Sequence, residues 1–187
     1  MGKKDEFMVK HNIVFNGEIL SIEEKPIQFD DYTILSVVNN GANAVVLKAR
    51  GNIANEIVAI KIWVPDERAD RLEQSVNEIK KMAKLNAEEY SKSLIRYYAS
   101  GCTNGFYYCI MEYLDTNNYI TLKERQKENM VLNERYQILM NIVSGLRCTQ
   151  ESMIFHGDLH SENILINKRE SSIGLSLLAS TSSRDDL

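Results

Sequence analysis

Three strand-like runs joined by short polar links constrain the fold of this chain more than any other feature. The runs cover residues 32–38, 45–50 and 56–64, and they are rich in Val, Ile, Leu and Ala. Links this short cannot make the crossover that a parallel strand pair requires, but they readily close antiparallel hairpins. The three runs therefore predict an antiparallel meander in which the strands pair in chain order.

The segment before the meander, residues 1–30, begins with charged residues and then predicts a hairpin of its own. Its two short apolar runs are residues 13–15 and 18–20, and the dipeptide Asn16-Gly17 lies between them. Asn-Gly is the pair best suited to a type I′ turn, because both of its residues tolerate a positive φ. Nothing in this segment indicates chemistry.

A helix and a second pair of strands are expected after the meander. Apolar residues in steps of three and four predict an amphipathic helix, and these residues are Ala69, Leu72, Val76, Ile79 and Ala83. The runs 94–99 and 106–113 predict two more strands, with a turn at 101–105 between them.

The rest of the chain changes from strand to helix patterns, so we expect an α+β fold. Residues 115–131 are polar and predict short helix and loop, and residues 133–151 predict a helix. Residues 164–166 form a short β-branched run, whereas residues 167–187 are Ser-rich and predict a tail in which 173–178 could add a strand. The wide apolar face of the long helix consists of Ile138, Leu139, Ile142, Val143 and Leu146.

The polar octet 156–163 is the densest concentration of candidate functional residues. It lies between the long helix and the β-branched run, and it places His156, Asp158 and Asn163 at offsets zero, two and seven. Polar side chains so closely spaced between two apolar elements need polar partners, either one another or a ligand. The octet is therefore the first candidate for chemistry.

Three further features precede the octet: a turn that contains one glycine, a lysine on the third strand and a glutamate on the predicted helix. Singly, each has an ordinary interpretation, namely a hairpin turn, a solvated charge and a surface ion pair. In chain order they are the turn residues Asn39, Gly41 and Ala44 followed by Val46, the run Val58-Ala59-Ile60-Lys61, and Glu78.

The order of these features resembles the protein kinase family. The turn is similar to the family's G-x-G-x-x-G-x-V, the strand carries its V-A-I-K, and the octet is similar to H-R-D-L-x-x-x-N. The resemblance implies a protein-kinase-like fold: an antiparallel N-lobe sheet with one helix, then the start of a helical C-lobe. We expect an extension at 1–30, an N-lobe at 31–114, a partial C-lobe with the catalytic loop at 115–166 and a tail at 167–187.

By this resemblance, the function is ATP-dependent phosphorylation of protein Ser or Thr, with ATP and Mg²⁺ as cofactors. Lys61 would hold the α- and β-phosphates and be steadied by Glu78, Asp158 would accept the substrate's hydroxyl proton, and Asn163 would bind Mg²⁺. Met111 corresponds to the gatekeeper. The residues implied to contact the nucleotide are Val38, Asn39, Gly41, Ala44, Val46, Ala59, Lys61, Glu112, Leu114 and Leu165.

Three departures from the family pattern keep other functions open. Gly157 replaces the Arg before the catalytic Asp, His160 replaces a Lys, and no D-F-G follows Asn163, as after an interrupted reading frame. His-Gly-Asp-Leu-His also resembles aminoglycoside- and choline-type phosphotransferases, although these carry a long insertion between the positions of Glu112 and His156. A small-molecule phosphotransferase of that type is therefore the first alternative, and a nucleotide-binding pseudokinase fragment or scaffold is the second. Because the D-F-G is missing, we expect weak or no turnover from this chain.

Composition limits the expected partners and compartment. The net charge of −4 gives no reason to expect nucleic acid, and no apolar run is long enough for a membrane span. The odd number of cysteines favours a reduced, cytoplasmic setting. Besides a protein substrate, we expect self-association or a partner that covers the exposed side of the helix at 133–151, because its apolar face is too wide for one neighbour.

Overall fold

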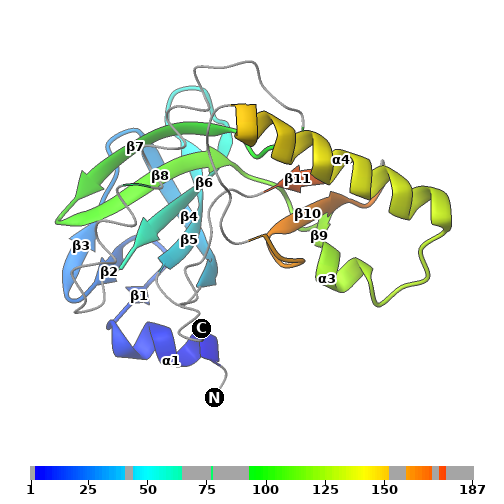
Figure 1. The fold of residues 1–187 in the computed structure, drawn as a ribbon. Helices are drawn as coiled ribbons and strands as arrows, with labels where there is room; N and C mark the ends of the chain where they lie inside the picture. Colours follow the sequence, from blue (N-terminus) through cyan, green and yellow to red (C-terminus); the bar gives the residue numbers. More distant parts are fainter. Residues whose placement is uncertain are drawn as a thin grey trace. The chain divides into compact units, whose positions relative to one another are not determined.

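The computed structural model describes residues 3–40, 44–64, 77, 93–151, 159–169 and 173–175. The chain divides into two compact units (Figure 1). Unit 1 draws on the described residues within Met1–Ile79 and Tyr97–Tyr113, and unit 2 on those within Lys80–Arg96 and Leu114–Ala179. Each unit is described by itself.

Unit 1 contains a five-stranded sheet in the order β4-β5-β6-β8-β7, and every neighbouring pair is antiparallel. The first three strands form the meander that the sequence predicts. The strands are β4 Tyr32–Asn40, β5 Ala44–Gly51, β6 Ile57–Trp63, β7 Tyr97–Thr103 and β8 Phe106–Glu112. The helix expected around residues 66–83 lies outside the described residues, except for Asn77, which is helical.

The described part of the N-terminal extension, residues 3–30, folds onto this sheet. It consists of helix α1 Lys3–Lys10 and a small antiparallel sheet of β1 Val14–Phe15, β2 Leu20–Ile22 and β3 Lys25–Ile27 (Figure 1). The sequence predicts the β1–β2 hairpin, whereas α1 and β3 are additional. Buried residues of the extension and of the large sheet form one apolar cluster, which includes Phe7, Ile13, Leu20, Ile22, Ile27, Val45, Leu47, Val58, Ile60 and Ile62.

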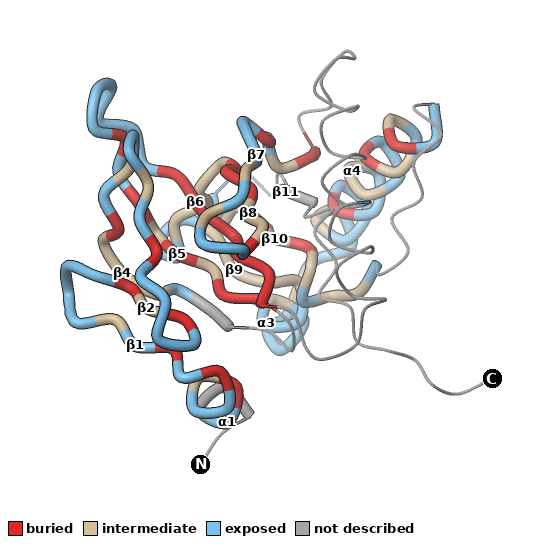
Figure 2. The backbone as a smooth tube through the Cα atoms, turned by 90° about the vertical axis from the view of Figure 1, so that its left-hand side faces the viewer, coloured by how far each residue is buried: buried red, intermediate tan, exposed pale blue. Residues whose placement is uncertain are grey.

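Strand β6 is buried on both of its faces (Figure 2). Successive side chains of a strand point to opposite faces, so Val58, Ile60 and Ile62 point into the cluster shared with the extension. Ala59, Lys61 and Trp63 point to the other face and are also buried. Burial of the Lys61 ammonium group on this face costs free energy, because a charged group loses its hydration there.

The type I′ turn occurs in a different hairpin from the one predicted. Asn16 and Gly17 belong to a longer loop, in which the Asn16 side-chain oxygen accepts from the backbone N–H groups of Glu18 and Ile19 at 3.0 and 2.8 Å. That side chain supplies the acceptor that a tight turn would take from the backbone. The two-residue turn is at Asn104-Gly105, where both φ angles are positive, at 48° and 88°.

The β7–β8 hairpin is therefore longer than expected from residues 94–99 and 101–105, since β7 extends to Thr103. Its tip is also attached to the extension. The Thr103 hydroxyl donates to the Gln28 carbonyl oxygen at 3.3 Å, and the Asn104 side-chain amide donates to the Pro26 carbonyl oxygen. These hydrogen bonds join segments that are far apart in the sequence.

The described residues of unit 2 form a three-stranded sheet in the order β11-β10-β9 and the helices α3 and α4. Helix α4 begins one residue before the predicted helix and packs with Leu94 and β10 in a second apolar cluster. Strand β9 lies in a segment predicted as helix and loop, and β11 is a short part of the strand suggested at 173–178. The elements are β9 Tyr119–Thr121, α3 Leu122–Arg125, α4 Leu132–Glu151, β10 Ile164–Asn167 and β11 Ile173–Leu175.

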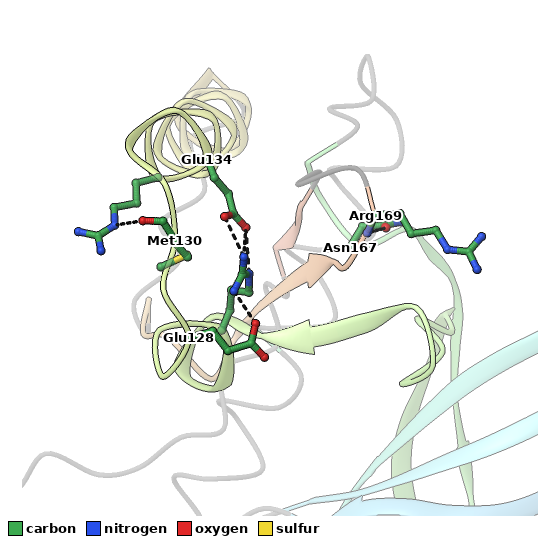
Figure 3. A network of polar contacts seen from close by, with 7 residues as sticks. Glu128, Met130, Glu134, Asn167 and Arg169 are labelled. Atoms are coloured by element: carbon green, nitrogen blue, oxygen red, sulfur yellow. Dashed lines mark hydrogen bonds and ion pairs between the residues drawn. The ribbon is translucent and has the colours of Figure 1, made fainter.

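An ion-pair network connects helices α3 and α4 (Figure 3). The Arg125 guanidinium donates to both carboxylate oxygens of Glu134, from Nε at 2.9 Å and from a terminal nitrogen at 2.8 Å. Its other terminal nitrogen lies 2.5 Å from Glu128. Arg125 and Glu134 are largely buried, so this bidentate pair fixes the start of α4 relative to α3.

Helix α4 buries only part of its apolar face, as expected from the width of that face. Ile138 is buried, and Ile142 and Leu146 pack against the cluster of unit 2. Leu139 and Val143 are at least half exposed. The exposed side thus forms an apolar strip on α4.

We expect Leu20→Ala to lower the free energy of unfolding by about 2–5 kcal/mol, because a fully buried Leu leaves a cavity when truncated. Ile19→Ala is the matched control, since Ile19 is the adjacent residue and is 45% exposed. Its expected cost is below about 1 kcal/mol. Urea unfolding of both variants measures the difference, and equal costs would show that the extension does not fold onto the sheet.

Candidate functional site

The face of the large sheet opposite the extension carries the candidate residues of unit 1. Because directly paired residues of antiparallel strands point to the same side, the strand register decides which side chains are neighbours. Two rows cross β5, β6 and β8 on this face, and a third joins β5 to β6. The rows are Val46–Lys61–Cys109, Lys48–Ala59–Met111 and Ala44–Trp63.

Lys61 is at the centre of this face. The side chain is only 5% exposed, although a lysine is among the residues least often buried. Its ammonium group lies 5.0 Å from the centroid of the Trp63 ring, two residues along the same strand. An ammonium group attracts anions, so Lys61 would stabilise an anionic ligand that reaches this face.

Apart from Lys48, the side chains beside Lys61 on this face are small or apolar. Ala59 is buried between Lys48 and Met111 and presents only a methyl group. Val46 is half-buried in the row of Lys61, and Val38 on β4 is 37% exposed. A buried cation beside small apolar side chains can accommodate a ligand with one anionic and one apolar part.

The turn between β4 and β5 is described only at its ends. Asn39 pairs with Val46 in the ladder of β4 and β5, and Ala44 is a buried residue at the start of β5. Gly41 lies outside the described residues. The end of β8 is fully described: Glu112 is half-buried, and the next residue, Tyr113, has the Lys48 ammonium 4.8 Å from its ring centroid.

Unit 2 carries the end of the polar octet. The backbone N–H of Asn163 donates to the carbonyl of His160 at 3.0 Å, which closes a turn directly before β10. Two contacts from α3 support this turn: the Lys123 backbone N–H donates to the Ser161 carbonyl at 3.1 Å, and the Lys123 ammonium donates to Glu162 at 2.6 Å. The hydrogen bond to Glu162 raises the pKa of Lys123.

His160 makes a further contact within this turn. Its Nδ1 atom accepts a hydrogen bond from the backbone N–H of Glu162 at 3.2 Å. The side chain is half-exposed, at the position where the sequence motif has a lysine.

The structure places only some of the predicted site residues. Lys61, Ala59, Val46 and Val38 share the sheet of unit 1. Leu114, Leu165 and Asn163 are half-buried residues of unit 2. Glu78, His156 and Asp158 lie outside the described residues, so Lys61 is the one predicted catalytic residue that is described.

Sequence reasoning missed two aromatic partners of the lysines, Trp63 and Tyr113. A signal for the first was present, since Trp63 follows Lys61 by two positions and must share its face of the strand. Tyr113 offers no such local signal, because Lys48 is on a different strand and only the sheet register makes them neighbours.

Among the described residues, no group of three or more His, Cys, Asp or Glu side chains could hold a metal ion. Asn163, the one metal ligand that the sequence predicts, is described and half-buried. No described helix has the length and apolar character needed to cross a membrane.

Comparison with known proteins identifies relatives of this chain. The sequence model of the protein kinase domain matches residues 32–177. The serine/threonine-protein kinase pakG of Dictyostelium discoideum is 26% identical over 137 residues, which cover 73% of this chain and 11% of pakG. The human serine/threonine-protein kinase MAK is 31% identical over 139 residues, which cover 72% of this chain and 21% of MAK.

A solved structure agrees at the level of the fold. The PknI kinase domain of Mycobacterium tuberculosis matches with a TM-score of 0.65 at 18% identity, over 82% of this chain and 62% of that one. This likeness confirms the expected kinase-like α+β fold. The chain spans about a tenth to a fifth of the length of the two curated relatives.

Proposed function

The chain belongs to the protein kinase family, and from this premise we propose that it is part of an ATP-dependent protein Ser/Thr kinase. The observation that supports this best is the buried ammonium of Lys61 beside Ala59 and Val46 on one face of the sheet. A nucleotide matches this face chemically, because its phosphates are anionic and its adenine is flat and weakly polar. The proposed domain limits are 31–114 for the N-lobe and 115–166 for the partial C-lobe.

We propose the following roles for the nucleotide contacts. Lys61 neutralises the α- and β-phosphates, with Glu78 as its carboxylate partner, while the turn of Asn39, Gly41 and Ala44 approaches the phosphates with its backbone. The remaining contacts meet the adenine, through the side chains of Val38, Val46, Ala59 and Leu165 and through backbone groups of Glu112 and Leu114.

The chemical step assigns two more residues. Asp158 would accept the proton of the substrate hydroxyl, which makes the oxygen a better nucleophile. The amide oxygen of Asn163 is a hard ligand of the type that Mg²⁺ accepts, and the hydrogen bond from its backbone N–H to His160 fixes the backbone directly before β10. Mg²⁺ would supply charge neutralisation at the phosphates, but one amide oxygen is a weak site by itself.

A nucleotide-binding protein with little turnover is the second candidate, and one feature of the sequence favours it. No D-F-G follows Asn163 within the 187 residues, so the Asp that shares the metal in this family has no counterpart in this chain. A small-molecule phosphotransferase is the third candidate, and incubation with aminoglycosides and choline tests it directly.

We expect Lys61→Met to weaken ATP binding by about 10- to 100-fold, because a charge-assisted hydrogen bond to phosphate is lost. Lys25→Met is the matched control, since Lys25 also lies over an aromatic ring, at 5.4 Å from the centroid of Phe106, but is exposed on the extension. Calorimetric titration measures both affinities. Equal affinities in the two variants would place the nucleotide elsewhere.

Turnover by the 187-residue chain should be at least about 10²-fold below ordinary kinase rates, since even one lost charge-stabilising donor costs this much. Radiolabelled ATP with a mixture of protein substrates measures it. Any residual transfer should disappear in Asp158→Asn, whereas Asp115→Asn, outside the proposed site, should leave it unchanged. Ordinary kinase rates that Asp158→Asn abolishes would contradict the expected low turnover.

We further propose that a second copy of the chain covers the apolar strip on α4. We also propose that the chain works in a reducing, cytoplasmic compartment. All three cysteines are thiols in the structure, which fits that compartment. We expect Leu139→Glu with Val143→Glu to reduce association, because both side chains are at least half exposed on the strip. Sedimentation at several concentrations measures this, with Gln137→Glu as the control, and a monomeric parent chain would contradict it.

A further inference from the structure

Trp63 and Lys61 form a buried cation–π pair on β6. Their positions differ by two, so both side chains lie on the face opposite the extension. The Lys61 ammonium is 5.0 Å from the centroid of the indole ring, within the range of this attraction, and the two residues are 5% and 6% exposed. We propose that Trp63 is a positioning residue of Lys61, in addition to the proposed carboxylate partner Glu78.

Comparison with two other lysine–aromatic pairs in unit 1 shows what is special here. Lys48 lies over Tyr113 at 4.8 Å and Lys25 over Phe106 at 5.4 Å, so the distances are similar. Lys25 is exposed and Lys48 is half-buried, whereas Lys61 is buried. A cation–π attraction is stronger where water is excluded, and indole is the strongest of the three rings.

The ring also restricts where the ammonium can go. A lysine side chain has four rotatable bonds and loses much freedom when it is held in one place. The rigid indole, itself buried and paired through the backbone of Trp63 with Ala44, gives the ammonium a fixed surface to lie on.

The consequence for ligands rests on the proposed nucleotide binding. If Trp63 keeps the Lys61 ammonium group where it can bind phosphate, replacing Trp63 lowers the affinity for nucleotides that carry phosphate. The affinity for adenosine, which has no phosphate, should not change. We expect Trp63→Leu to reduce the affinity for ADP by about threefold to thirtyfold, the range that corresponds to a partly to fully desolvated cation–π pair. Trp63→Phe retains a ring and should recover part of the affinity.

The first measurement needs no nucleotide. Trp63 is the single tryptophan of the chain, so the fluorescence emission reports on its surroundings alone. Lys61→Met removes the charge next to the ring and should shift the emission maximum, whereas Lys61→Arg keeps a cation and should not. Lys48→Met is the matched control and should leave the emission unchanged. An unchanged emission in Lys61→Met would overturn the proposal.

The second measurement compares ADP with adenosine by calorimetric titration in the parent chain, Trp63→Leu and Trp63→Phe. An equal loss for both ligands in Trp63→Leu would show that Trp63 only maintains the fold, and would overturn the proposal. In the Lys61→Met background, replacing Trp63 should have no further effect on ADP. If the parent chain binds neither ligand, the proposed function fails, and the emission of the Lys61 variants still decides whether Trp63 holds Lys61.

Discussion

The burial of β6 along nearly its whole length is the constraint on which the rest of unit 1 depends. On one face, Ile60 and its neighbours meet the apolar side chains of the extension, and on the other face a lysine is kept from water. Burial of apolar surface supplies the main favourable free energy of such a sheet, and desolvation of an ammonium group opposes it. The packing of the apolar face therefore helps to offset the cost of burying Lys61 on the opposite face.

This relation gives the N-terminal extension a part in the site although it contributes none of the proposed site residues. The extension covers the apolar face, which holds the strands of the meander in register, and register alone decides that Val46, Lys61 and Cys109 form one row. A slip of one residue would turn Lys61 into the apolar cluster. By packing against the opposite face of the sheet, the extension thus stabilises the position of Lys61.

The sequence predicted the parts of this structure that depend on local pattern. The β-branched runs and short links predicted the meander, and the apolar spacing predicted α4 within one residue of its observed start. The type I′ turn was assigned to Asn16-Gly17 rather than Asn104-Gly105, because the outcome depends on a side-chain hydrogen bond that the dipeptide does not reveal. Within the site, the sequence motifs predicted the role of Lys61. The cation–π contact of Lys48 with Tyr113 is visible only in the folded sheet.

The hydrogen bonds from the β7–β8 tip to the extension have a consequence for the order of folding. Thr103 and Asn104 are separated from their acceptors, Gln28 and Pro26, by 75 and 78 residues. Contacts at such separation close only after the chain between them has been made and has partly folded, which slows folding. During synthesis the extension leaves the ribosome first. Its hydrogen bonds to the β7–β8 tip can form only after that hairpin has been synthesised.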